Sequence, residues 1–270
     1  MGTTAGIGLF FCLFARMLEY DILNDGDDCM KIGIFDSGIG GLTVLKQIIK
    51  KYPNANYLYY GDTLHLPYGE KTKEQLLEYA CKIIDFFLEQ GVNKIVIACG
   101  TVSSTIYENL KTIYSIEMIS VVDATVTAIN KTNIDKVAVL ATSKTIDSHM
   151  FSKKLSNINV LEVSCPKFVP YLEHQIGDKQ EILSEYLEFI KKEKIEHIIL
   201  GCTHYPLLEA DIKNYFNYEI ICYNMGLFVA NTIEIEESSY HLTLYFSKVD
   251  ESLKENIKKI LDTNYNIIEV

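Results

Sequence analysis

The chain of 270 residues is long enough for one large α/β domain or two small ones, and its 48% hydrophobic and 23% charged residues are ordinary for a soluble globular protein. The formal net charge of −11 argues against a broad nucleic-acid-binding surface. We therefore expect no nucleic-acid partner, although a small anionic substrate can still bind through local donors and dipoles.

The first 29 residues fit neither a membrane span nor a signal peptide. Their apolar stretch GIGLFFCLFARMLEY, from Gly6 to Tyr20, is short for a span, lacks a charged start and has no clear small-residue cleavage site. The next residues, MKIGIFDSG, begin like a natural first strand. We therefore predict that Met30 is the true start, that residues 1–29 are a non-native extension, and that the protein has no membrane partner. The alternative is a genuine amphipathic appendage.

Short apolar runs alternate with longer segments of helical spacing along the rest of the chain. In chain order, we predict the strand Lys31–Phe35, the helix Leu42–Lys51, the strand Asn56–Tyr60, the helix Thr72–Gln90, the strands Ile95–Ala98 and Val137–Leu140, the helix Gln180–Lys192 and the strand Ile198–Leu200. This alternation indicates βαβ units and a mainly parallel sheet. Ligands of such sheets bind at the carboxyl ends of the strands, so the residues after each strand are the candidates for a site.

Two segments resemble each other. VIACGT and ILGCTH both run from an apolar strand through a small residue to a cysteine and a threonine, and their cysteines are 202 − 99 = 103 residues apart. The repeat predicts two similar α/β lobes with parallel sheets and a pseudo-two-fold relation. We place residues 30–123 and 226–270 in the first lobe and residues 124–225 in the second.

The cysteines do not look like structural bridges. Their number is odd and none forms a Cys-x-x-Cys pair; they are Cys12, Cys29, Cys81, Cys99, Cys165, Cys202 and Cys222. This pattern argues against both a disulfide framework and a zinc ribbon. Reduced thiols in a cytoplasmic protein without a metal site are the simpler interpretation.

Cys99 and Cys202 each end a predicted strand at what looks like a helix N-terminus. The positive end of a helix stabilises a thiolate, so we expect the thiol pKa to be lowered there from its usual value of about 8.5. Either cysteine alone is better explained as a small buried hydrophobic residue than as a functional thiol. Two in matching contexts favour a function, whereas Cys165 is best interpreted as packing.

Several other polar residues follow the predicted strands. FDSGIGG places Asp36 in a glycine-rich turn, either as a helix cap or as a ligand-binding or acid/base group. LPYGE places Tyr68 and Gly69 in a loop whose backbone N–H groups could hold a carboxylate. His204 lies two residues after Cys202 and could orient or deprotonate that thiol, whereas Glu173 by itself looks like a solvated helix residue.

The segments GIFDSGIGGLTVL, YYGDTLHLPYGEKT, VIACGTVSS, CPKFVPYLE and ILGCTHYPLL, in this order, resemble the signature of the glutamate racemases. These enzymes belong to the cofactor-independent aspartate/glutamate racemase superfamily. The similarity extends from about Lys31 to the C-terminus. It implies two lobes with the active site in the cleft between them, and a two-base reaction with no cofactor. It also implies a homodimer that supplies D-glutamate for peptidoglycan.

The resemblance implies roles for individual residues as well. Cys99 would act on D-glutamate and Cys202 on L-glutamate, as acid and base on opposite faces of one carbon. Asp36, Glu173 and His204 would assist the thiols. The substrate's polar ends would be held by residues on both sides of the site: Asp36, Ser37, Tyr68, Gly69, Gly100, Thr101, Thr203 and His204.

One position departs from the family pattern. The first cysteine is usually followed by Asn-Thr, but here Gly100 and Thr101 follow it. The asparagine side chain normally bonds the substrate, and Gly100 can offer only its backbone N–H. The change at Gly100 therefore leaves open the affinity for glutamate and the choice of substrate.

Three alternatives to a glutamate racemase remain. A racemase for aspartate or another amino acid would fit the change at Gly100. A racemase scaffold acting as a binding partner or inhibitor would parallel family members that bind DNA gyrase, although the two intact cysteines predict activity. A thiol redox or metal role would require pairs or clusters that the cysteine spacing does not favour.

Overall fold

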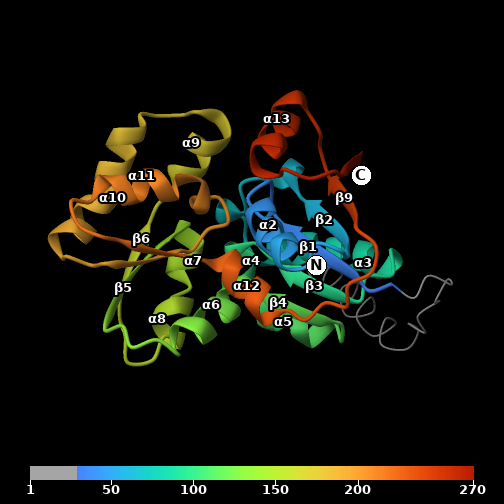
Figure 1. The fold of residues 1–270 in the computed structure, drawn as a ribbon, viewed down its shortest axis with the longest axis horizontal. Helices are drawn as coiled ribbons and strands as arrows, with labels where there is room; N and C mark the ends of the chain where they lie inside the picture. The colour runs from blue at the N-terminus through green and yellow to red at the C-terminus, as the bar shows by residue number, and fades with distance from the viewer. Residues whose placement is uncertain (1–28) are drawn as a thin grey trace, which may run out of the picture.

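The computed structural model describes residues 29–270, which form an α/β fold with two separate parallel sheets (Figure 1). The predicted N-terminal extension lies outside the described residues, except for Cys29. Within residues 29–270, no helix combines the length and the apolar character that crossing a membrane requires.

The first sheet has six strands in the order β10-β9-β2-β1-β3-β4. They are β1 (Lys31–Asp36), β2 (Asn56–Gly61), β3 (Lys94–Ile97), β4 (Glu117–Ser120), β9 (His241–Phe246) and β10 (Asn266–Glu269). The helices of this part are α2 (Leu42–Lys51), α3 (Lys73–Glu89), α4 (Gly100–Thr105), α5 (Tyr107–Ile113) and α13 (Glu251–Ile260), with short 3-10 turns η1 (Thr63–His65) and η2 (Tyr68–Glu70). Every strand pair is parallel, so the loops that follow β1, β2 and β3 meet at one edge.

The second sheet has four strands in the order β6-β5-β7-β8, again all parallel. The strands are β5 (Lys136–Ala141), β6 (Asn159–Ser164), β7 (His197–Leu200) and β8 (Ile221–Asn224). Around them lie α7 (Ser143–Asp147), α8 (Met150–Lys154), α9 (Phe168–His174), α10 (Lys179–Lys192), α11 (Glu209–Tyr215) and the 3-10 turn η3 (Tyr205–Leu208). This sheet and its helices form the left half of Figure 1.

Two helices connect the halves. The chain leaves the first sheet through α6 (Val121–Ile129) and returns through α12 (Met225–Thr232), and the two helices pack against each other between the sheets (Figure 1). One hydrophobic core runs through both halves, since it includes Val96 of β3, Val139 of β5 and Val229 of α12. The predicted lobe boundaries, near residues 123 and 226, fall within these two helices and stay a prediction.

The predicted helices and strands are present, with their ends shifted by one residue at most. The long helix α3 begins with a capping box, in which Thr72 and Gln75 each accept a hydrogen bond from the other's backbone N–H. Asp178 caps α10 by accepting the N–H groups of Gln180 and Glu181. Strands β4, β6, β8, β9 and β10 were not predicted.

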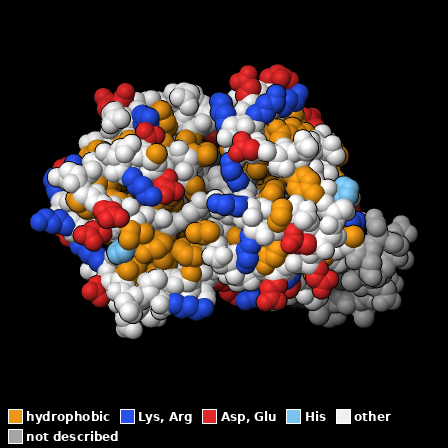
Figure 2. Space-filling view, in the orientation of Figure 1, with side chains coloured by type: hydrophobic (Ala, Val, Ile, Leu, Met, Phe, Trp, Pro, Cys, Tyr) orange, Lys and Arg blue, Asp and Glu red, His pale blue; other side chains and the backbone are white. Residues whose placement is uncertain are grey.

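The surface carries both signs of charge. Figure 2 shows lysine and acidic side chains interspersed over both halves of the face in view, without a continuous area of either sign. The net charge of −11 is therefore not gathered into one patch on that face.

Candidate active site

The residues singled out from the sequence converge where the two sheets face each other. Thr203, after β7, donates its hydroxyl to Asp36 at the end of β1, over 3.3 Å. Thr43 in α2 donates to the backbone oxygen of Thr203 over 2.7 Å. The loop after β7 is thus joined to the first sheet by hydrogen bonds between buried groups. These bonds fix the loop after β7 relative to the loop after β1.

Cys99 lies at the start of α4, just after β3, and only 4% of it is exposed. Its thiol lies 3.7 Å from the hydroxyl oxygen of Ser37. Burial, followed by the nearby charge of Asp36, raises the pKa of Cys99 to about 12, although the backbone N–H of Val102 opposes the shift. The expected lowering of this pKa is therefore wrong, because desolvation outweighs the contribution of a short helix.

Cys202 belongs to a chain of three polar side chains. Its sulfur lies 3.8 Å from Nδ1 of His204, and Nε2 of His204 lies 2.8 Å from Oε1 of Glu173 in α9. Burial acts to lower the pKa of His204, but its contacts with Cys202 and Glu173 raise it well above the ordinary value. Burial acts to raise the pKa of Glu173, but His204 outweighs it and the net shift is downward. We infer an imidazolium between Cys202 and an ionised Glu173.

Asp36 is fully buried beside these groups. Its Oδ2 accepts the backbone N–H groups of Gly38 at 3.1 Å and Gly41 at 2.9 Å, at the start of α2. Burial raises the pKa of Asp36, opposed by the charge of His204 and by these hydrogen bonds. Asp36 therefore both fixes the turn before α2 and faces the candidate site. The neighbouring Gly40 is needed, since a Cβ there would lie 2.4 Å from Nδ1 of His204.

Three other predicted substrate-holding residues lie in the segments that follow β2 and β3. Thr101 is buried, and its hydroxyl lies 3.1 Å from that of Thr142. A Cβ on Gly69 would lie 3.9 Å from Cβ of Thr142, so Gly69 also faces the second sheet. The hydroxyl of Tyr68 donates to Asp62 over 2.7 Å.

A row of hydroxyl groups that was not predicted from the sequence joins the two halves. Thr142 follows β5 and lies 3.0 Å, oxygen to oxygen, from Thr145, which accepts from Ser104 in α4 over 3.4 Å. A signal was present, because LATSKT places hydroxyl residues directly after a predicted strand, as VIACGT does. The buried carboxylate of Asp62 was also missed.

The arrangement suits proton transfer. Two buried thiols project from loops of different sheets, and Cys202 is close enough to raise the pKa of Cys99. Each thiol has its own polar neighbour, so each can give or take a proton within a water-poor site. Within residues 29–270, no group of three or more His, Cys, Asp and Glu side chains is placed to hold a metal ion.

Comparisons with known proteins identify the family. The family model of Asp/Glu/hydantoin racemases matches residues 54–224. A glutamate racemase of Hydrogenobaculum sp. is 37% identical over 248 residues, which cover 88% of this chain and 95% of that protein.

Solved structures show the same fold. A glutamate racemase from Francisella tularensis, crystallised with D-glutamate, has a TM-score of 0.79 and 28% identity, covering 90% of this chain and 98% of that one. A glutamate racemase isoform from Bacillus anthracis has a TM-score of 0.83 and 26% identity, covering 89% and 97%. The α/β class and the resemblance to glutamate racemases are confirmed. The chain therefore belongs to the Asp/Glu/hydantoin racemase family and is an amino-acid racemase.

Proposed function

We propose that this protein interconverts L-glutamate and D-glutamate by a two-base reaction, with Cys99 and Cys202 as opposing acid and base. The observation that carries the proposal is the pair of buried thiols held on loops of two different sheets, each beside its own polar partner. The similarity to glutamate racemases, one of them crystallised with D-glutamate, supports glutamate as the substrate.

In the D-to-L direction, the thiolate of Cys99 takes the α-proton. The C–H electron pair passes into the α-carbon and its carboxylate, and the thiol of Cys202 gives its proton to the opposite face. One C–H bond breaks and one forms, one S–H bond forms and one breaks, and nothing is oxidised or reduced. The thiols end in exchanged protonation states, and the L-to-D direction runs the same steps in reverse.

The neighbours of the two thiols differ in a way that fits this assignment. His204, held as a cation by Glu173, stabilises an anion at Cys202, whereas burial and Asp36 favour a protonated Cys99. In the proposed assignment Cys202, the thiol beside this cation, is the one that acts on L-glutamate.

Hydroxyl and backbone donors in the segments that follow β1, β2, β3 and β7 would hold the substrate's carboxylates. Ser37, Thr101 and Thr203 supply hydroxyls, and Gly69 and Gly100 supply N–H groups that a ligand can approach closely. Donors at the α-carboxylate stabilise the charge that develops when the proton leaves.

The cellular role we propose is the supply of D-glutamate for peptidoglycan in a bacterial cytoplasm, by a homodimer that needs no cofactor. Light scattering of the purified protein tests the dimer. A mass of 30.7 kDa at working concentration would contradict it.

The activity is tested by incubating the reduced protein, without added cofactor, with L-glutamate and separately with D-glutamate. Circular dichroism should decay from both directions to the same racemic end point, and aspartate should react much more slowly. Faster racemisation of aspartate would favour the alternative substrate. No change with glutamate would overturn the proposal.

A further inference from the structure

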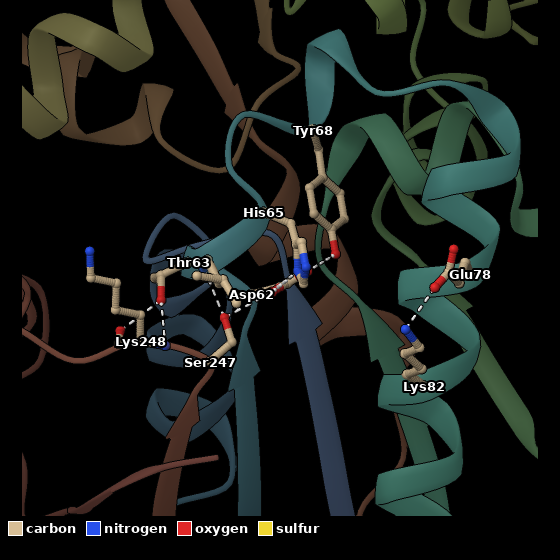
Figure 3. A network of polar contacts seen from close by, with 9 residues as sticks. Asp62, Thr63, His65, Tyr68, Glu78, Lys82, Ser247 and Lys248 are labelled. Carbon is tan, nitrogen blue, oxygen red and sulfur yellow. Dashed lines mark hydrogen bonds and ion pairs between the residues drawn. The ribbon is translucent and has the colours of Figure 1, made fainter.

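A buried carboxylate that takes no part in the proposed proton transfers lies beside the substrate-holding loop. Asp62 follows β2 and is only 3% exposed. Its carboxylate accepts the hydroxyls of Tyr68 at 2.7 Å and Ser247 at 2.8 Å, and both its oxygens lie 2.8 Å from Nδ1 of His65 (Figure 3). Its backbone N–H donates to the carbonyl of Asp36 over 3.1 Å.

This carboxylate fixes the direction of Tyr68. The ring of Tyr68 is buried and lies edge-on to Phe35, with their centroids 6.4 Å apart. Burial and Asp62 raise the pKa of Tyr68, so its phenol stays protonated and donates. The hydrogen bond is short, at 2.7 Å, and both of its partners are buried. This hydrogen bond therefore fixes Tyr68, the first residue of η2, and with it the next residue, Gly69.

The same carboxylate is anchored from the C-terminal part of the chain. The hydroxyl of Ser247, just after β9, also accepts the N–H of Leu64 over 2.9 Å. Thr63 donates to the carbonyl of Lys248 over 2.7 Å and accepts its N–H over 3.1 Å. Thr63 and Leu64 are thus bound to a segment far along the chain, and Figure 3 shows the contacts of Thr63 with Lys248.

We propose that Asp62 is a positioning residue for substrate binding, which fixes the Tyr68–Gly69 segment through the Tyr68 hydroxyl and is itself held by Ser247. This inference rests on the proposed function. Because Asp62 does not touch the thiols, its loss should weaken the hold on substrate and leave proton transfer nearly intact. The expected kinetic result is a higher KM with little change in kcat.

The test is the variant Asp62→Asn, which keeps the shape and removes the charge. We expect KM to rise about tenfold for both glutamate isomers and the Kd for D-glutamate, by calorimetry, to rise by a similar factor. We expect kcat to stay within about twofold. The matched control is Glu78→Gln, which breaks the exposed Glu78–Lys82 pair on nearby α3 (Figure 3) and should change neither constant.

A double variant separates positioning from general loosening. If Asp62 acts through Tyr68, then Asp62→Asn combined with Tyr68→Phe should raise KM no more than the larger single effect. The inference would be overturned if the KM increases of the two single variants multiplied in the double variant, or if KM were unchanged in Asp62→Asn. If Asp62→Asn does not fold, Ser247→Ala keeps the carboxylate and should raise KM about threefold. An unchanged KM there would equally overturn it.

The wild-type assay distinguishes the two proposals. A wild type that does not racemise glutamate contradicts the proposed function and this inference with it. An active wild type with an unaffected Asp62→Asn contradicts this inference alone.

Discussion

The carbonyl oxygen of Gly201 lies 2.8 Å from the point that a Cβ atom on residue 100 would occupy. The loops of the two sheets therefore meet backbone to backbone, directly beside Cys99 and Cys202. Gly100 therefore has a packing role here, because any side chain at residue 100 would push against the backbone of the other sheet.

The first prediction concerns this contact. Gly100→Asn should lower kcat/KM for glutamate by about tenfold or more, because the loops must separate and the thiols move apart from their working positions. Racemisation followed by circular dichroism measures it. Gly100→Ala adds only the Cβ and should show a similar loss. A gain in Gly100→Asn, with a loss in Gly100→Ala, would mean that a missing hydrogen bond matters more than the contact.

The second prediction concerns the two thiols. Cys99→Ser and Cys202→Ser should each lower kcat/KM by roughly a thousandfold, since a hydroxyl is a far weaker acid than a thiol and general acid–base catalysis contributes on that scale. The half-buried Cys222, on β8, offers the control Cys222→Ser, which should retain wild-type activity. Either active-site variant racemising at the wild-type rate would rule out the two-thiol reaction.

The third prediction is a pH effect on activity. The L–D equilibrium constant is one, so kcat/KM must be equal in the two directions at every pH. At alkaline pH, kcat/KM should fall as His204 loses its proton. The pKa of His204 is raised well above 6.5. Glu173→Gln removes the anion that holds this proton, so the alkaline limb should move to lower pH. A limb that stays in place, or moves upward, would show that His204 is not the titrating group.

The fourth prediction is a pH effect on stability. The pKa of Glu173 is depressed in the fold from its ordinary 4.5, so its stabilising contribution is present above that value and lost as the pH falls through the lower folded pKa. Asp36 contributes the opposite pH dependence. Because its pKa is raised in the fold, its contribution to the free energy of unfolding falls as the pH rises through 3.8 and above. Urea unfolding at several pH values should show that Glu173→Gln loses less stability on acidification than the wild type. An identical acid dependence would contradict the ion pair with His204.

Much of the fold could be predicted because its signals are local. The strands β1, β3, β5 and β7 are runs of apolar, mostly β-branched residues that are buried on both faces, which is typical of a parallel sheet between helices. The missed strands carry weaker patterns. β4 and β8, with the sequences EMIS and ICYN, are as short as the predicted β3 and β7, but each begins with an exposed residue and contains polar ones. β4 and β8 form as strands because the fold places them next to β3 and β7, with which they pair.

Local patterns were enough to predict the alternation of helices and strands, the two cysteines at strand ends and the residues that follow them, because each depends on the spacing of nearby side chains. The folded chain was needed to show that β9 pairs with β2, that Ser247 supports Asp62, and that Gly100 meets Gly201. It also decided the raised pKa of Cys99, since that depends on how completely residues far apart in the chain exclude water from the thiol. Long-range contacts depend on how whole elements pack, and no short stretch of this sequence encodes that packing.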